Sequence, residues 1–261
     1  MAKNKLAKFA EMETLPNVFQ PRHAEVFRTD YLLKGKWNAE VFRNNHPIVL
    51  EIGCGKGEYT VELAKLYPEK NFIGLDIKGA RMWKGAKMAV EEGLSNVAFL
   101  RMYAELLDSA FAPEEIDEIW ITFPDPQMTK ARKRLTGTRF LGLYRKILKP
   151  DALIHLKTDS PFLYAYTAEV LKTNRMRAEV QTEDLYGGGY EDKILGIKTF
   201  YEKQWLSRGK KIKYIRFSLN TDAPLVEPDI DIERDDYHSE TRYMNTDGNT
   251  PDGQTNETRH V

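Results

Sequence analysis

The sequence predicts an α/β fold in which a seven-stranded, mostly parallel sheet carries helices on both faces. Three observations lead to this expectation. Short β-rich runs alternate with helix-length segments, a glycine-rich loop joins one buried run to a helix, and acidic residues stand at the ends of several runs. Strands separated by helices imply right-handed crossovers, and such crossovers produce a parallel sheet covered on both faces.

The elements follow one another between residues 46 and 220. We expect strands at 48–52, 71–76, 96–102, 117–123, 152–157, 177–182 and 211–219, and helices at 57–67, 79–92, 138–148 and 161–172. In the helix at 138–148 the apolar residues keep the spacing of one stripe, and Lys149-Pro150 ends it. The last two strands have no full helix between them, so the sheet is expected to finish with an antiparallel pair.

Composition narrows the class of protein. The 261 residues are 41% hydrophobic and 30% charged, which allows a buried core in one large domain or two small ones. The apolar runs are strand-sized, so we expect no membrane span, and no apolar segment like that of a signal peptide follows the basic start. One cysteine, Cys54, excludes an internal disulfide, and five histidines lack zinc spacing. We expect a soluble cytoplasmic protein without a metal.

The net charge of zero hides an asymmetry. Residues 221–261 hold eleven Asp/Glu and three Arg, a net of −8, which leaves residues 1–220 at +8. We therefore expect three parts: a basic N-terminal arm with a short helix (1–45), a folded domain (46–220) and an acidic, mostly disordered tail (221–261). A basic body favours a polyanionic partner.

The sharpest local feature is the loop Glu51-Ile52-Gly53-Cys54-Gly55-Lys56-Gly57, at a junction of strand and helix. Glycines there permit a tight turn and let a ligand approach backbone N–H groups. Asp76 ends the next strand, where its carboxylate is placed to accept hydrogen bonds from a ribose.

Two nucleotide cofactors suit that geometry. A dinucleotide site usually reads G-x-G-x-x-G and holds a pyrophosphate, which Glu51 would repel. S-adenosylmethionine carries an ammonium, a sulfonium and a ribose without phosphate, so the acidic loop favours a methyltransferase. Cys54 has no histidine near it in the sequence and is better explained as a small packing residue than as a nucleophile.

A second group of polar residues follows the strand at 117–123. Asp125 lies between two prolines that fix its backbone, and it is expected to face the same crevice as Glu51 and Asp76. A helix-capping role for Asp125 is the alternative. Two basic clusters, at 130–146 and 208–216, suggest a phosphate-contacting surface and hence a nucleic-acid substrate.

Together these motifs resemble the bacterial tRNA (guanine-N(7)-)-methyltransferase family, of the TrmB type. The resemblance covers about residues 25–220. It rests on EIGCGKG at 51–57, GLDIK at 74–78, FPDP at 123–126 followed by KARKR, KTD at 157–159 and TFYE at 199–202. It implies a class I, Rossmann-like enzyme that methylates nitrogen-7 of a variable-loop guanine, position 46, in tRNA with S-adenosylmethionine, forming 7-methylguanosine.

The resemblance also implies roles for individual residues. Cofactor contacts are expected from Glu51, Gly53, Gly55, Asp76, Tyr103 and Asp125. Substrate contacts are expected from Lys130, Asp159, Thr199, Tyr201 and Glu202, and contacts to the tRNA backbone from Arg132, Lys133 and Arg134. Two positions depart from the family pattern. Tyr103 stands where an acidic residue is usual, and Gln127 follows FPDP where tryptophan is common.

The expected chemistry needs no general base, since nitrogen-7 of guanine carries a lone pair and no proton. It needs alignment and a carboxylate to stabilise the cationic product, for which Asp125 and Asp159 are the candidates. Three alternatives stay open: a methyltransferase for another acceptor, a NAD-dependent oxidoreductase, and a non-catalytic RNA-binding relative. The sequence leaves a monomer and a homodimer equally open.

Overall fold

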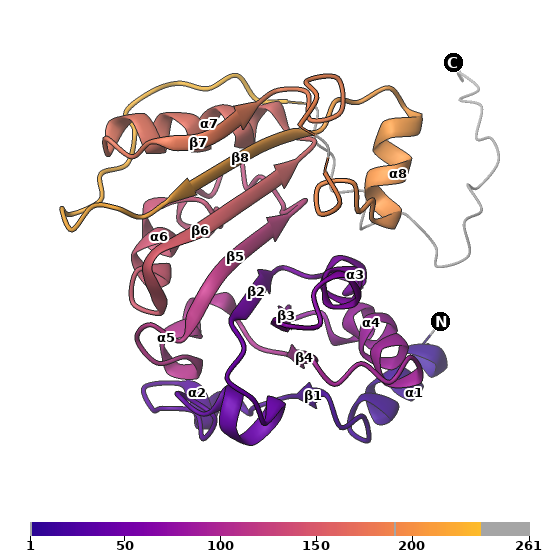
Figure 1. Ribbon diagram of the computed structural model, residues 1–261. Coiled ribbons are helices and arrows are strands. Elements are labelled where there is room, and N and C mark those ends of the chain that lie inside the picture. Colours follow the sequence, from indigo (N-terminus) through magenta and orange to yellow (C-terminus); the bar gives the residue numbers. More distant parts are fainter. Residues whose placement is uncertain (1, 191, 236–261) are drawn as a thin grey trace, which may run out of the picture.

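The computed structural model describes residues 2–190 and 192–235, in which eight strands form one sheet (Figure 1). The strands are β1 (Val18–Phe19), β2 (Ile48–Ile52), β3 (Asn71–Leu75), β4 (Val97–Leu100), β5 (Ile116–Thr122), β6 (Leu148–Thr158), β7 (Ala178–Thr182) and β8 (Lys213–Ser218). They lie in the order β1-β4-β3-β2-β5-β6-β8-β7. The pairs from β1 to β6 are parallel, whereas β8 is antiparallel to both neighbours, as expected for the end of the sheet.

Helices flank this sheet. They are α1 (Ala2–Met12), α2 (His23–Val26), α3 (Glu58–Leu66), α4 (Gly79–Glu91), α5 (Leu107–Ala110), α6 (Thr138–Tyr144), α7 (Pro161–Thr173) and α8 (Phe200–Ser207). A π-helical turn spans Trp37–Phe42, and short 3-10 turns span Ala104–Leu106 and Ala131–Lys133. None of the helices in the described part of the chain has the length and apolar content to span a bilayer.

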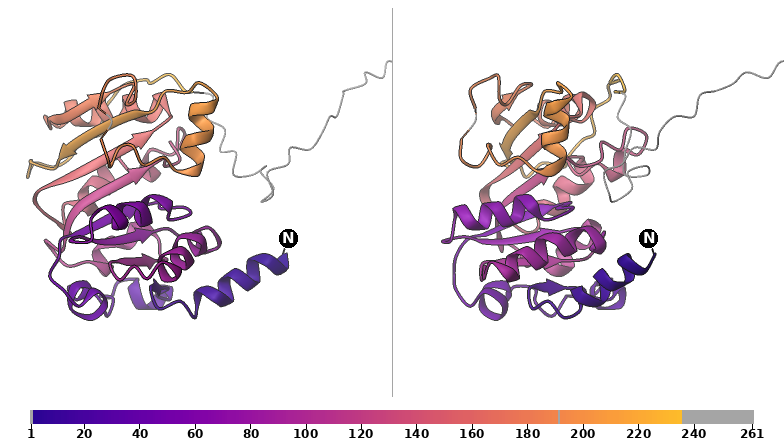
Figure 2. Two further views of the ribbon diagram at one scale, coloured as in Figure 1. Left: turned by 45° about the vertical axis from the view of Figure 1, so that its right-hand side comes forward. Right: turned by 90° about the vertical axis from the view of Figure 1, so that its right-hand side faces the viewer.

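Each face of the sheet has its own apolar core, and Figure 2 shows helices on both sides of it. In β2, Ile48, Leu50 and Ile52 join the core that contains α5, α6 and α7. Val49 joins the opposite core, formed with α3 and α4. Successive side chains of a strand point to opposite faces, and both faces of β2 are covered by a core. All five residues of β2 are therefore buried.

The N-terminal segment is more than the expected arm with one short helix. α1 packs on α4, where Glu11 accepts a hydrogen bond from Trp83 and pairs with Lys87, both at 2.7 Å. β1 pairs with β4, so the sheet has eight strands and not seven. Trp37 is fully buried in the core. A strand of two residues leaves no alternating pattern, which explains why the sequence did not reveal it.

Residues 221–235, which their composition predicts to be disordered, form an extended segment on α6 and α7. The Glu227 carboxylate accepts a hydrogen bond from the Thr138 backbone N–H at 3.1 Å, and Asp235 accepts one from a backbone N–H in the first turn of α7 at 3.1 Å. Carboxylates placed on helix N-termini are favourable there, which offsets the scarcity of apolar side chains. The remaining predicted tail, 236–261, lies outside the described residues.

Two further differences concern helices. α6 ends at Tyr144, earlier than the predicted end at 148, because β6 already begins at Leu148 and pairs there with β5. α8 was not predicted at all. Both elements matter for the site, since the loop before α6 and the first turn of α8 lie beside it.

Candidate active site

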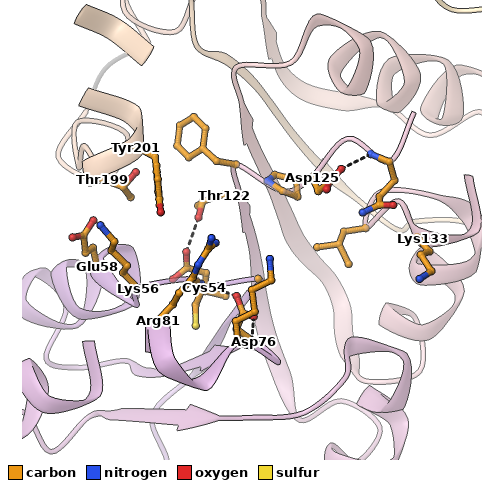
Figure 3. A pocket seen from close by; sticks show the side chains of 18 residues that line it. Cys54, Lys56, Glu58, Asp76, Arg81, Thr122, Asp125, Lys133, Thr199 and Tyr201 are labelled. Carbon is orange, nitrogen blue, oxygen red and sulfur yellow. Dashed lines mark hydrogen bonds between the residues drawn. The ribbon is translucent and has the colours of Figure 1, made fainter. Parts of the chain in front are cut away.

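A cavity of about 310 Å³ lies at the carboxyl ends of β2, β3 and β5 (Figure 3). In the strand order, the chain leaves β2 toward β3 on one side and returns beside it with β5, so this is the switch point of the sheet. The residues that line the cavity are Glu51, Gly53, Cys54, Gly55, Lys56, Glu58, Asp76, Lys78, Arg81, Thr122, Phe123, Pro124, Asp125, Gln127, Lys133, Leu135, Thr199 and Tyr201. Most of the residues expected at the site are therefore brought together.

The glycine loop after β2 forms the floor of the cavity. Gly57 has a φ of +70°, and a Cβ at this position would lie 2.5 Å from the Phe99 ring, so only glycine fits. The backbone N–H of Gly53 donates to the Leu75 carbonyl at 2.8 Å, which ties the loop to the end of β3. These contacts set the loop tightly against the sheet and start α3 directly behind it.

Glu51 is the buried acid of this floor, with 2% of its surface exposed. Its carboxylate accepts hydrogen bonds from the Thr122 hydroxyl at 2.6 Å, from the Thr60 N–H at 2.9 Å and from the Thr60 hydroxyl. Burial raises the pKa of Glu51 to about 7, although the hydrogen bonds from the two threonines work in the opposite direction. A cation in the cavity would favour the ionised carboxylate.

Asp76 stands at the end of β3 beside the loop. One carboxylate oxygen accepts from the Gly55 N–H at 2.9 Å, and the other accepts from the Lys78 N–H at 2.7 Å. The two bonds hold the carboxylate at the cavity wall. Tyr103, in contrast, follows β4, is 55% exposed and is not among the residues that line this cavity.

Asp125 reaches the cavity from the loop after β5. Its side chain is exposed, and its carboxylate accepts a hydrogen bond from the Gln127 N–H at 3.0 Å. Phe123 and Gln127 have positive φ angles of 49° and 48°, a strained conformation for residues other than glycine. The strained loop places Asp125 in the wall of the cavity, with its carboxylate turned toward the Gln127 N–H (Figure 3).

Asp159, the other carboxylate considered for charge stabilisation, lies elsewhere. It is 4% exposed and lines a separate depression with Lys210, Lys211 and Lys213. Burial raises the pKa of Asp159, although the ammonium of Lys210, 3.6 Å from its carboxylate, acts in the opposite sense. Of the two carboxylates, only Asp125 shares the cavity with Glu51.

The predicted tRNA-backbone residues separate into two groups. Arg132 is exposed, and Lys133 is exposed and lines the cavity; Lys130, expected to contact the substrate, is exposed beside them. Arg134 is buried instead: its guanidinium donates to the Met128 carbonyl at 2.9 Å and packs on the ring of Tyr166. Arg134 thus braces the loop after β5 and is buried, unlike the exposed Arg132 and Lys133. Its burial does not match the tRNA-backbone contact that the resemblance implied for it.

The predicted TFYE stretch forms the first turn of α8. Thr199 and Tyr201 line the cavity beside Lys56 of the glycine loop, whose ammonium lies 5.0 Å from the centre of the Tyr201 ring, but Glu202 is fully buried and does not line it. The expected substrate contact from Glu202 is therefore not available in this structure. Its carboxylate pairs with Lys157 inside the protein at 2.9 Å.

Sequence reasoning missed several residues of the cavity. Thr122 and Lys56 are the main ones: Thr122 holds Glu51, and the Lys56 ammonium lies 3.7 Å from the centre of the Phe200 ring. The place of Lys56 within the glycine loop was visible, but nothing in its pattern separates it from a surface lysine. Cys54 is buried, and burial raises the pKa of its thiol well above its usual range, which disfavours the thiolate that a nucleophile needs.

The chemistry of these residues fits S-adenosylmethionine. Glu51, Asp76 and Asp125 supply acidic groups for an ammonium, a ribose diol and a sulfonium, and the loop between Gly53 and Gly55 brings its backbone close to the ligand. Among the described residues, no group of three or more His, Cys, Asp and Glu side chains could hold a metal ion.

The fold and the cavity define a class I, Rossmann-like methyltransferase that uses S-adenosylmethionine. The crystal structure of the 16S rRNA methyltransferase KamB has the same fold, with a TM-score of 0.54 and 16% sequence identity over 69% of this chain and 90% of that one. A family model described as "Putative methyltransferase" matches residues 45–215.

Two relatives identify the family within this class. A tRNA (guanine-N(7)-)-methyltransferase of Porphyromonas gingivalis is 59% identical over 88% of this chain and 96% of its own length. One of Bacteroides thetaiotaomicron is 54% identical over 93% of this chain and 96% of its own. The chain belongs to the tRNA (guanine-N(7)-)-methyltransferase family, which confirms the resemblance seen in the sequence.

Proposed function

We propose that this protein methylates nitrogen-7 of the variable-loop guanine at position 46 of tRNA, forming 7-methylguanosine. The observation that supports this most is that Asp125, on its strained loop, shares one cavity with the buried Glu51 and with Asp76. The names of the relatives supply the substrate class and the atom that is methylated. A tRNA substrate also supports a cytoplasmic location for the enzyme.

S-adenosylmethionine supplies an electrophilic methyl group when it is bound. Nitrogen-7 has a free lone pair, so no side chain needs to remove a proton from the base. The protein has to align the base and to stabilise the positive charge that develops on it. Asp125 performs the electrostatic part, because it is the exposed carboxylate of the cavity.

The other residues bind and orient. Glu51 and Asp76 hold the cofactor at the end of β2 and β3, while Thr199 and Tyr201 form a wall against which the base lies. Lys133, at the cavity, and the exposed Lys130 and Arg132 beside it contact the phosphates of the tRNA. Tyr103 and Asp159 lie outside the cavity.

The test is methyl transfer from labelled S-adenosylmethionine to unmodified tRNA transcripts, followed by borohydride–aniline cleavage at 7-methylguanosine. We expect cleavage at one variable-loop guanine. Asp125→Asn preserves the size of the side chain and removes its charge, so the rate should fall about 100-fold. Asp108→Asn, at a salt bridge with Lys146 remote from the cavity, is the matched control. Incorporation at another position, or none despite bound cofactor, would contradict the proposal.

A further inference from the structure

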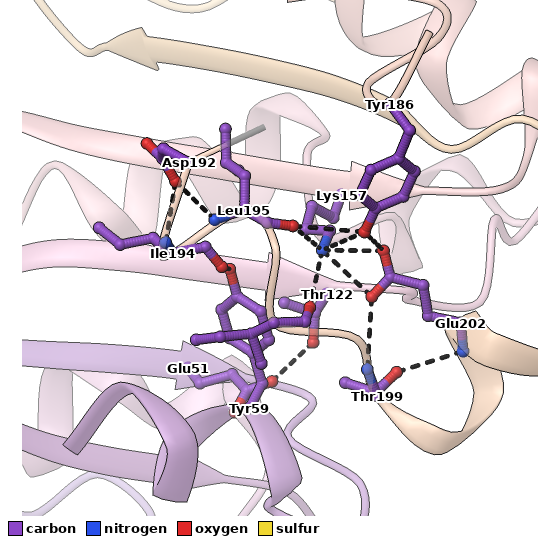
Figure 4. Close-up of polar contacts among 11 residues, drawn as sticks. Glu51, Tyr59, Thr122, Lys157, Tyr186, Asp192, Ile194, Leu195, Thr199 and Glu202 are labelled. Atoms are coloured by element: carbon purple, nitrogen blue, oxygen red, sulfur yellow. Dashed lines mark hydrogen bonds and ion pairs between the residues drawn. The ribbon is translucent and has the colours of Figure 1, made fainter. Parts of the chain in front are cut away.

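A completely buried ion pair lies behind one wall of the cavity (Figure 4). Lys157 comes from the end of β6 and Glu202 from the first turn of α8, and both side chains have 0% exposure. Their charged atoms are 2.9 Å apart. Lysine and glutamate are almost never fully buried without a partner, so this pair needs an explanation of its own.

The pair connects four segments of the chain. The Lys157 ammonium also donates to the carbonyls of Leu195 and Ile197, each at 3.1 Å, and lies 3.5 Å from the Tyr186 hydroxyl. The Tyr186 hydroxyl donates in turn to the Glu202 carboxylate. Thus β6, the turn at residue 186, the loop through residues 195–197 and the start of α8 meet at one ammonium (Figure 4).

The same turn of α8 carries the cavity wall. The Glu202 N–H donates to the Thr199 hydroxyl at 3.3 Å, and the Glu202 carboxylate accepts from the Thr199 N–H at 3.4 Å, which forms a capping box. Tyr201 lies between these two residues and lines the cavity together with Thr199. A shift of the first turn of α8 would therefore move both cavity residues.

Stability alone does not account for the pair. A buried ion pair gives little or no net stabilisation over an apolar pair of similar volume, because both charges lose their hydration. A buried polar network in which every group is satisfied does, however, favour one arrangement of its members. The arrangement selected here is the one that places Thr199 and Tyr201 on the cavity wall.

We propose that Lys157 and Glu202 are positioning residues, which fix the first turn of α8 and thereby hold Tyr201 in place for the methyl transfer. In this assignment Glu202 acts through its neighbours and does not touch the guanine. The inference rests on the proposed function for its activity measurements, but its conformational measurement is independent of activity.

The decisive variant replaces both members, Lys157→Met together with Glu202→Gln. The single Lys157→Met variant leaves a buried carboxylate without its cation and should melt at a clearly lower temperature. The double variant removes that unpaired charge, so its melting temperature should recover most of the loss. We expect its methyl-transfer rate to remain about 100-fold low, with unchanged affinity for S-adenosylmethionine by calorimetry. Recovery of both stability and rate would overturn the proposal.

A mutant cycle with Tyr201→Ala tests whether the effect passes through the cavity wall. If the pair acts by positioning Tyr201, replacing Lys157 and Glu202 should cause little further loss of rate in a protein that already carries Tyr201→Ala. If the loss of rate in the combined variant equalled the product of the two separate losses, the pair would act elsewhere, and the proposal would be overturned.

Hydrogen exchange supplies the measurement that needs no substrate. We expect faster exchange of the amides at 195–202 in the double variant than in the wild type. Lys70→Met, which breaks a pair with Glu118 near the amino ends of the strands, is the matched control and should leave these amides unchanged. Unaltered protection in the double variant would refute the positioning role. Absence of tRNA methylation by the wild type would refute the proposed function instead, and the exchange result would still decide the positioning role.

Discussion

Glu51→Gln should make the protein more stable at alkaline pH while it weakens cofactor binding. Burial raises the pKa of Glu51 from 4.5 in the unfolded chain to about 7 in the folded protein. Between these two values the folded state binds more protons than the unfolded state. The free energy of unfolding therefore falls as the pH rises from 4.5 to 7, and it stays at the lower level above pH 7.

The size of the effect follows from the two pKa values. One pKa unit corresponds to about 1.4 kcal/mol, so the change from 4.5 to about 7 corresponds to roughly 3 kcal/mol. Glutamine can still accept the hydrogen bond from the Thr60 N–H, and its amide can bond to the Thr122 hydroxyl, so the variant loses the charge and little else. For a chain of this size, roughly 3 kcal/mol corresponds to a rise of about 6–12 °C in melting temperature.

Thermal unfolding of the wild type and of Glu51→Gln at pH 5 and pH 8, without cofactor, measures this difference. We expect similar melting temperatures at pH 5 and a higher one for the variant at pH 8. The exposed Glu69→Gln is the control and should follow the wild type at both pH values. Added S-adenosylmethionine should stabilise the wild type more than the variant. If the melting temperatures of the variant and the wild type differed by the same amount at pH 5 and at pH 8, Glu51 would not titrate in this way.

Three further predictions concern the loop, the basic rim and the C-terminal segment. Gly57→Ala should lower the free energy of unfolding by about 2 kcal/mol in urea titrations, since its Cβ would lie 2.5 Å from Phe99 at a positive φ; normal stability would mean that the loop relaxes. Arg132→Glu should weaken tRNA binding and reduce its salt dependence, measured by titration at several salt concentrations, and an unchanged slope would place the phosphates elsewhere. Truncation after Asn220 removes Glu227 from the start of α6 and should lower the melting temperature by a few degrees, in contrast to the unchanged value expected of a disordered tail.

The sequence predicts well those residues of the cavity that lie at the ends of strands. Glu51 is the next-to-last residue of β2, and Asp76 and Asp125 follow β3 and β5. The carboxyl ends of parallel strands meet at one edge of the sheet. Strand positions alone thus suffice to bring these three carboxylates together. Asp159 also follows a strand, but it lies in a neighbouring depression because its strand, β6, is one strand further from β2 than β5 is.

Sequence could not predict which charged side chains are buried. Glu202 stands in the first turn of a helix and Arg134 in a run of basic residues, two settings in which charges usually face solvent. Their burial depends on partners distant in the sequence, Lys157 for the first and the ring of Tyr166 for the second. Such pairings are decided by the tertiary fold, and no local pattern of charge or spacing records them.

The position of β8 has a consequence for how the protein is made. β8 is inserted between β6 and β7, so the described sheet cannot be completed before β8 has left the ribosome. Until then the nascent chain presents β6 as an open edge, with unpaired backbone groups along residues 153–158 that another chain could join. The strands that carry the glycine loop and Asp76 are complete much earlier in synthesis. A growing chain therefore acquires its cofactor-binding half first and its tyrosine wall later.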